Sequence, residues 1–211
     1  MGAYMTIDPG KNDPRNIYKL MTGAIVPRPI AFVSTVNGSG ARNLAPFSFF
    51  TGISANPPVI CFAPMVRTSG VERKKDTLRN IEETGEFVVN VVSEDIAEKM
   101  NACSPEFPSA VDEFEVAGLT AIASDLVKPP RVGESKISME CRLVRIVEVS
   151  DKPLGGSLVL GEIVRFHVAD QLFDNFRIDA DGLCAIGRMA GADYVRTTER
   201  FSMTRPGSAQ K

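Results

Sequence analysis

The chain contains the stretch ISMECRLVRIVEV at residues 137–149 and, after a Pro-Leu-Gly-Gly turn, the stretch SLVLGEIVRFHV at residues 157–168. In the first stretch, apolar Ile137, Met139 and Cys141 alternate with polar residues. This two-residue period is typical of an antiparallel strand that buries one face and exposes the other. The pattern therefore predicts two long strands joined by a turn.

Shorter patterns toward the N-terminus indicate a chain in which strands dominate. Strands are predicted at 30–36, from about Ala41 onward, at 58–63 and at 87–92, with the turn Asn37-Gly38-Ser39-Gly40 between the first two. Short helices are predicted at 17–21, 76–84, 94–101 and 112–116, and we expect Asp76 to cap the second of them and Gly85 to end it. Few and short helices favour a mainly β fold, a closed or nearly closed antiparallel barrel, over a doubly wound sheet.

Length and composition predict one ordinary globular domain over residues 1–211, because 44% of the residues are hydrophobic and 24% are charged. The 24 Lys and Arg nearly balance the 26 Asp and Glu, for a net charge of -2. Without a basic surplus, a nucleic-acid partner is not expected. No apolar run has the length of a membrane span and no secretory signal is recognisable, so we expect no membrane association and a cytoplasmic location.

Several kinds of active site are disfavoured by what the sequence lacks. The four cysteines lie far apart and His167 is the single histidine, so neither a zinc site nor a hydrolase triad is expected. There is no phosphate-binding P-loop motif. The run at 38–43 begins like a dinucleotide fingerprint but lacks its third glycine, and a hairpin turn is the better interpretation.

A cluster of basic and hydroxyl residues indicates an anion site. Arg67-Thr68-Ser69-Gly70 is followed closely by Arg73-Lys74-Lys75-Asp76-Thr77, at the start of the helix predicted at 76–84. Free N–H groups at a helix start favour an anion, and the basic side chains and hydroxyls would add bonds to phosphate oxygens. The alternative is a solvated loop in which Asp76 itself takes up the helix N–H groups.

The segment from Asn43 to Pro58 combines aromatic side chains with three prolines. Phe47, Phe49 and Phe50 stand beside Ser48 and Thr51, and we expect Pro46, Pro57 and Pro58 to interrupt regular strand pairing. An apolar slot lined by unpaired backbone groups would suit a flat heteroaromatic ring. The alternative is that the three phenylalanines simply pack in the core.

Taken together, these stretches resemble the flavin reductase-like, FMN-binding split-barrel family, and more closely its flavoprotein oxygenase/reductase components related to the small subunit of nitrilotriacetate monooxygenase. Seven stretches carry the resemblance, in family order: PRPIAFVST at 27–35, NLAPFSFF at 43–50, NPP at 56–58, KKDT at 74–77, GEFVVN at 85–90, GEIVRFHV at 161–168 and IGRMAGADY at 186–194. Two stretches depart from many relatives, which carry Gly-Arg-Val at 161–163 and Arg-Leu-Gly-Gly at 188–191.

The resemblance implies a six-stranded antiparallel split barrel that forms a homodimer, with FMN near the subunit interface. It implies that Thr35 and the Phe47-Ser48-Phe49 backbone address the flavin ring, Thr51 the ribityl-phosphate end, and Arg67, Lys75, Asp76 and Thr77 the phosphate. His167 and Arg188 are candidates for the nicotinamide side. Each also has a structural interpretation, His167 as a half-buried strand residue and Arg188 in a dimer salt bridge.

The implied activity is that of an NAD(P)H:flavin oxidoreductase, in which hydride passes from NADH or NADPH to FMN, as in the reductase component of a two-component monooxygenase. A second hypothesis is an electron-transfer flavoprotein of the flavoredoxin kind, with tightly bound FMN and no nicotinamide site. A third is a non-catalytic, ligand-binding split barrel. The sequence does not separate NADH from NADPH, nor a bound FMN from one released after each turnover.

Overall fold

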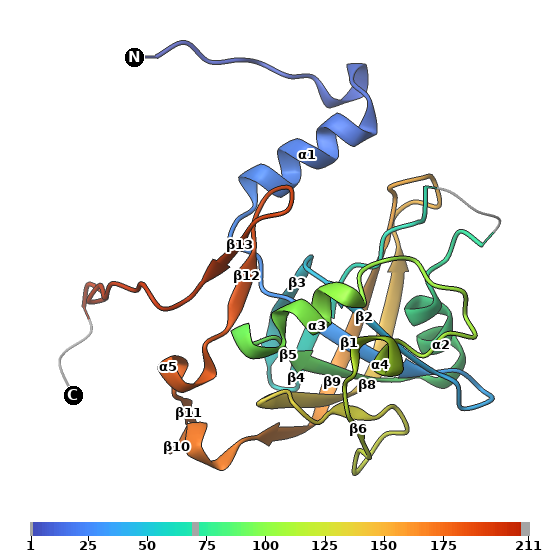
Figure 1. Cartoon of the computed structure of the whole chain (residues 1–211). Helices are drawn as coiled ribbons and strands as arrows, with labels where there is room; N and C mark the ends of the chain where they lie inside the picture. Colours follow the sequence, from blue (N-terminus) through green and yellow to red (C-terminus); the bar gives the residue numbers. More distant parts are fainter. Residues whose placement is uncertain (1, 69–71, 208–211) are drawn as a thin grey trace.

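The two long strands form the middle of the main sheet in a computed structural model, which describes residues 2–68 and 72–207 (Figure 1). β8 (Ile137–Glu148) and β9 (Ser157–Val168) pair antiparallel along nearly their whole length. Five further strands complete a seven-stranded sheet in the order β2-β1-β5-β8-β9-β4-β3, namely β1 (Ala31–Val36), β2 (Arg42–Phe47), β3 (Phe50–Ala55), β4 (Pro58–Phe62) and β5 (Glu86–Val91). Every pairing in this sheet is antiparallel.

The sheet closes into a barrel through chain continuity between its two end strands. β2 and β3 stand at opposite ends of the strand order, yet only Ser48 and Phe49 separate them along the chain. Taken as one bent strand, β2 and β3 bring the count to six, which confirms the predicted split barrel.

The prediction that prolines would keep the segment from Asn43 to Pro58 irregular is wrong for most of its length. Pro46 lies within β2, opposite Phe32 of β1, and Pro58 begins β4. Pro46 is tolerated because β2 pairs with β1 alone among the strands of its sheet, so its missing N–H removes no bond on the open side. The irregular backbone comprises the bend at Ser48 and Phe49, a register shift between Gly52 and Ser54 in β3, and the turn around the cis peptide bond Asn56–Pro57.

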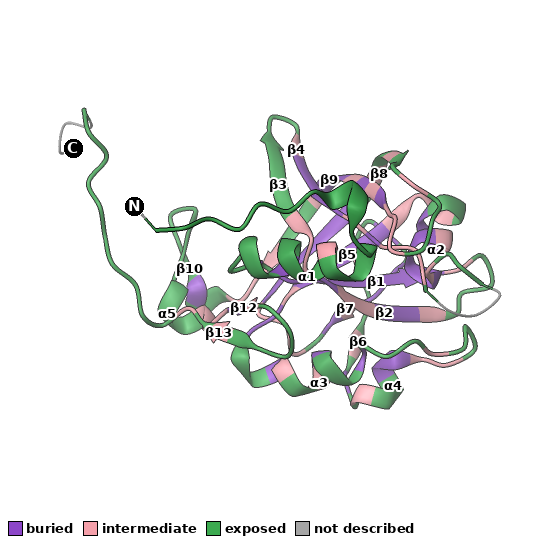
Figure 2. Cartoon of the chain, turned by 90° about the horizontal axis from the view of Figure 1, so that it is seen from above, coloured by how far each residue is buried: buried purple, intermediate pink, exposed green. Residues whose placement is uncertain are grey.

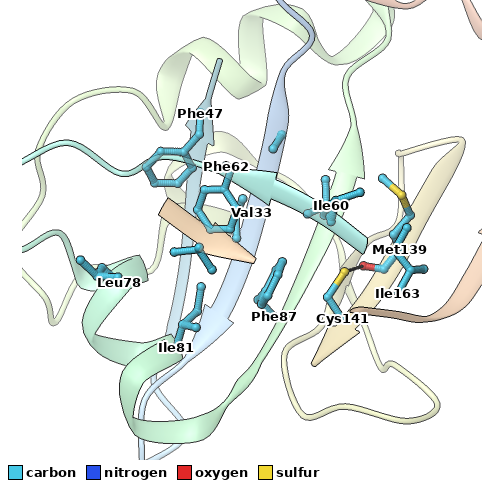
Figure 3. Packing of buried hydrophobic residues seen from close by; sticks show 13 residues of the cluster. Val33, Phe47, Ile60, Phe62, Leu78, Ile81, Phe87, Met139, Cys141 and Ile163 are labelled. Atoms are coloured by element: carbon cyan, nitrogen blue, oxygen red, sulfur yellow. Dashed lines mark hydrogen bonds between the residues drawn. The ribbon is translucent and has the colours of Figure 1, made fainter. Parts of the chain in front are cut away.

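The barrel interior is filled by aromatic and branched side chains from several strands (Figure 3). Phe47, Phe62 and Phe87 form a chain of rings, with centroids 5.1 Å apart in the first pair and 5.5 Å in the second. Gly161 of β9 leaves room for the Phe87 ring, which a Cβ at that position would overlap. Phe47 is therefore a core residue, as the packing interpretation expects.

The helices are short and lie outside the barrel. They are α1 (Pro14–Ala24), α2 (Asp76–Thr84), α3 (Ala97–Ala102), α4 (Glu113–Ala117) and α5 (Ala180–Leu183), with 3-10 turns η1 (Pro9–Lys11), η2 (Glu94–Ile96) and η3 (Asp170–Leu172). Two-stranded pairs are formed by β6 (Ala121–Ile122) with β7 (Arg131–Val132), β10 (Phe173–Asp174) with β11 (Arg177–Ile178), and β12 (Ile186–Arg188) with β13 (Tyr194–Arg196).

The predicted bounds of α2 are confirmed, and Gly85 ends the helix at a φ of 71°. Asp76 does not cap the helix, however, because it is already the first helical residue and Lys75 holds the capping position. The Asp76 carboxylate is instead bound by Arg67 and Arg79. The helix predicted at 17–21 is longer at both ends. It begins earlier because Asp13 caps it and Pro14 fits its first turn.

α1 projects from the barrel beside the β12–β13 pair and most of its residues are exposed (Figures 1 and 2), while Tyr18 contacts Phe49 at the bend between β2 and β3. α2, α3 and α4 lie against the barrel on the side of β1 and β2. Among the helices of the described residues, none combines the length and the apolar character that a membrane crossing requires.

Candidate functional site

The start of α2 carries the predicted anion-binding residues. Lys75 caps the helix through its backbone and gives no side-chain cap bond, so the helix-start N–H groups receive no side-chain oxygen from it. Arg67 reaches the same place from within the segment between β4 and α2, and its Nη2 donates to Asp76 Oδ2 at 2.7 Å. Two cationic side chains and a helix N-terminus therefore converge at one point.

Five of the predicted cofactor residues line one small cavity of about 40 Å³ beside this helix start. They are Phe47, Arg67, Lys75, Asp76 and Thr77. The opposite wall is formed by the loop at 103–107, together with Glu113. Thr68 is exposed, and Ser69 lies outside the described residues.

Arg67 has a buried donor that is open to a ligand. Its Nε is buried and makes no hydrogen bond with any described residue. The nearest acid is Glu106, whose Oε1 lies 3.6 Å from Arg67 Nε and 3.7 Å from Lys75 Nζ. Both distances exceed those of good charge-assisted hydrogen bonds, so Glu106 is only loosely paired with these two cations.

Burial and neighbouring charges shift the acidity of these groups. Burial lowers the pKa of Lys75, an effect that nearby Glu106 opposes and Arg67 reinforces. For Asp76, burial alone would raise the pKa, but hydrogen bonds from Arg67 and Arg79 hold it below the usual value. Asp76 is therefore a fixed anion that orients Arg67, rather than a direct ligand of a phosphate.

The hydroxyl groups of two predicted cofactor residues accept hydrogen bonds from buried side-chain amides. Thr77 Oγ1 accepts from Asn43 Nδ2 at 2.9 Å, and Thr35 Oγ1 accepts from Asn80 Nδ2 at 3.0 Å. Thr35 is fully buried and lines neither this cavity nor the two described next, so the geometry does not support its hydroxyl as a flavin contact. Thr77 is also buried but lines the cavity.

A second cavity, of about 270 Å³, adjoins the first. The two share Pro46 and Ser104 in their walls, and the second adds Ser48, Arg188 and Tyr194. Arg188 stacks over the Tyr194 ring at 4.4 Å from the centroid and donates to the Gly191 carbonyl. The structure thus brings Arg188 and Ser48, which the sequence places 140 residues apart, into one compartment.

Buried Arg28 fixes the bend that carries Ser48. Its Nε donates to Ser48 Oγ at 3.2 Å, its Nη1 to the carbonyls of Thr22 and Ile25, and its Nη2 to the carbonyl of Met189. One guanidinium thereby ties the end of α1, the bend between β2 and β3, and the end of β12 together. Arg28 belongs to a stretch that carries the family resemblance, yet no local pattern showed that its side chain would turn inward.

Phe49 and Thr51 lie beyond this second cavity. Phe49 lines a third cavity of about 580 Å³, which is mostly apolar, and its ring meets Tyr18 of α1 edge to face with centroids 6.4 Å apart. Thr51 is exposed on β3 and lines none of the three cavities. Phe47, Ser48 and Phe49 therefore each face a different one of three neighbouring cavities.

His167 is placed away from these cavities. Its Nε2 lies 2.6 Å from Oε1 of Glu140, a fully buried residue whose carboxylate also accepts the backbone N–H groups of Asp125 and Leu126. Although burial would raise the pKa of Glu140, these bonds and His167 hold it below the usual value. This geometry fits the interpretation of His167 as a half-buried strand residue. His167 lines none of the three cavities.

Comparison with known proteins gives consistent matches over nearly the whole chain. A protein of Halalkalibacterium halodurans whose function is uncharacterized is 39% identical over 210 residues, 98% of this chain and 99% of that protein. The crystal structure of nitrilotriacetate monooxygenase component B from Bacillus cereus is 39% identical, with a TM-score of 0.90 over 96% of this chain and 100% of that one. The 2-nitrobenzoate 2-nitroreductase of Pseudomonas fluorescens is 34% identical, with a TM-score of 0.87 over 98% and 99% of the two chains.

The family model for the flavin reductase-like domain matches residues 22–186, which include every strand of the barrel and both walls of the small cavity. The match covers more than half of the chain and agrees with the resemblance read from the sequence. The chain therefore belongs to the flavin reductase-like domain family.

Proposed function

We propose that this protein is an FMN-binding NAD(P)H:flavin oxidoreductase that holds the flavin phosphate at the start of α2. The observation that carries the proposal is the buried Arg67 Nε, which lacks a hydrogen-bond partner among the described residues and lies beside the Lys75 ammonium group. A buried donor without an acceptor is costly, and an anionic oxygen supplied by a ligand would satisfy it. The residues present therefore fit the phosphate of FMN.

The chain's own residues would bind and orient the cofactor. Arg67 and Lys75 would hold the phosphate, while Asp76 keeps the Arg67 guanidinium in place through the 2.7 Å bond to Nη2. Ser48, fixed by Arg28, would border the flavin in the adjoining cavity. FMN bound there would accept a hydride from a nicotinamide and pass the electrons on to an acceptor.

The cavity lined by Ser48 also favours a second candidate function, the reduction of the nitro group of a small aromatic carboxylate. Arg188 lines this cavity of about 270 Å³, and a guanidinium is well suited to a carboxylate. Similarity to a 2-nitrobenzoate 2-nitroreductase supports this candidate, just as similarity to nitrilotriacetate monooxygenase component B supports a role as the reductase of a two-component monooxygenase. In both candidate functions, hydride first passes from the nicotinamide to FMN.

Anaerobic mixing of the FMN-loaded protein with NADH or NADPH tests the proposal. Loss of the flavin absorbance near about 450 nm within seconds at one nicotinamide supports a reductase. A protein that binds FMN but is reduced by neither nicotinamide would instead be an electron-transfer flavoprotein. A protein that binds no flavin would be a different kind of split barrel. Adding 2-nitrobenzoate to the reduced protein distinguishes the second candidate, because reoxidation without oxygen then requires that acceptor.

A further inference from the structure

We propose that Glu106 is a built-in competitor of the flavin phosphate, and that it sets how tightly and how selectively a phosphorylated flavin binds. The inference rests on the proposed function and concerns the same anion site. It assigns to the loop at 103–107 a specific effect on affinity, opposite in sign to that of the cationic residues.

The geometry shows one carboxylate oxygen standing between two cations. Glu106 Oε1 is 3.6 Å from Arg67 Nε and 3.7 Å from Lys75 Nζ. These two nitrogen atoms are the ones to which we assign the phosphate. A phosphate oxygen and the Glu106 carboxylate would therefore compete for the same donors.

Glu106 is also held loosely enough to leave. Its side chain is 43% exposed, whereas the side chain of Arg67 is 12% exposed. Asp76, the other acid on Arg67, is buried and bound by two arginines, so it stays with the site. Exposed ion pairs contribute modestly to stability, so withdrawal of Glu106 into solvent changes an equilibrium by about tenfold or less.

The small size of the cavity points the same way. Its volume is about 40 Å³, room for a few water molecules, and Ser104, Pro105, Glu106 and Phe107 form one wall. A phosphate oxygen that bonds to both Arg67 Nε and Lys75 Nζ takes the place of Glu106 Oε1, so the Glu106 side chain has to move out. Binding of FMN is then weakened by the lost ion pairs, and by repulsion if the carboxylate remains near the phosphate.

This arrangement affects phosphorylated flavins alone. Riboflavin lacks the phosphate, so its affinity should not depend on the charge at position 106. A carboxylate that returns to the cations when the phosphate leaves also favours release, which suits a protein that exchanges FMN rather than holding it permanently.

Calorimetric titration of the flavin-free protein with FMN and with riboflavin tests the inference. In Glu106→Gln, we expect FMN affinity to rise about threefold to tenfold, with riboflavin affinity within about twofold of the parent. Glu115→Gln is the matched control, because Glu115 is also an exposed glutamate and lies 3.6 Å from the Arg42 guanidinium, away from the cavity. It should change neither affinity.

The outcomes separate this inference from the proposed function. If the parent prefers FMN to riboflavin and Glu106→Gln gains no FMN affinity, the competitor role is wrong while the phosphate site stands. If the parent binds both flavins equally, the phosphate site itself is wrong. Should Glu106→Gln unfold at a lower temperature than the parent, Glu106→Ala and competition by inorganic phosphate replace it, with tighter phosphate binding expected in the variant.

Discussion

Two nitrogen atoms of the Arg67 guanidinium differ in whether they have a hydrogen-bond partner. Nη2 donates to the buried Asp76 carboxylate, whereas Nε is buried with no hydrogen-bond partner among the described residues. Because Asp76 fixes one side of the guanidinium, the other side is presented in a constant orientation. A cation prepared in this way loses little side-chain entropy when it meets an anion.

Replacing Lys75 by alanine should weaken FMN binding selectively. In the proposed site the ammonium group would supply one charge-assisted contact to the phosphate, so its loss should reduce FMN affinity about 10- to 150-fold. Riboflavin affinity should stay within about twofold, since riboflavin makes no such contact. Calorimetric titration with both flavins measures the effect. Equal losses for the two flavins would show a folding defect, and an unchanged FMN affinity would place the phosphate elsewhere.

The buried amides explain why Thr35 could not be judged from the sequence. Asn80 lies on α2 and Thr35 on β1, 45 residues apart, and their hydrogen bond forms only when the helix packs on the barrel. Charge and spacing, by contrast, placed Lys75 and Arg67 correctly beside the α2 start. Glu106 carried no sequence signal, because its loop has no periodic pattern.

At the scale of the elements, Gly161 sets how closely β9 approaches the aromatic core. A Cβ at this position would overlap the fully buried Phe87 ring, which has no room to move. Gly161→Ala should therefore lower the free energy of unfolding by about 1–3 kcal/mol. Urea denaturation measures this change.

Gly52 of β3 provides the matched control for that substitution. An added Cβ there meets no atom within 4 Å, so Gly52→Ala should change the free energy of unfolding by less than about 0.5 kcal/mol. Equal effects of the two substitutions would mean that the packing of Phe87 against β9 is not what requires glycine.

Glu140 couples β8 to the loop at 125–126, and this should appear as a pH dependence. The folded pKa of Glu140 lies below its ordinary value of 4.5, so its stabilising contribution is present above that pH and is lost as pH falls through the folded pKa. Glu140→Gln should lower the free energy of unfolding at pH 7 by about 1.5–3 kcal/mol.

Urea denaturation between about pH 7 and pH 3 provides the measurement. The stability difference between parent and Glu140→Gln should shrink toward acid, because the parent loses a contribution that the variant lacks. Asp76, Asp95 and Asp125 also have lowered pKa values and remain in both proteins, so the comparison reports on Glu140 together with its partner His167. A difference that stays constant with pH would contradict the assignment.

The elements differ in how far the sequence revealed them. β8 and β9 followed from their two-residue period, and the bounds of α2 followed from its pattern and Gly85. β2 and β3 were not predicted as strands over their full length, because proline usually marks a break in pairing. Only the position of β2 at one end of the strand order makes Pro46 harmless, and that position is a property of the whole sheet.

The whole molecule leaves apolar side chains exposed on the barrel and on α1, which supports the prediction of a homodimer. Ile53, Val144, Val149 and Phe166 are each more than half exposed, and most residues of α1 are exposed as well. Sedimentation equilibrium at micromolar concentration should give about twice the chain mass of 22.9 kDa. A monomer that still binds flavin would contradict this prediction.

We propose that the whole protein anchors a flavin through its phosphate, so flavins with and without a phosphate should bind with different affinities. Calorimetric titration of the parent protein with FMN and with riboflavin, under the same conditions, measures what the phosphate contributes. With Arg67 and Lys75 as the anchor, FMN should bind at least about tenfold more tightly than riboflavin, at one flavin per chain. Equal affinities for the two flavins would contradict the claim.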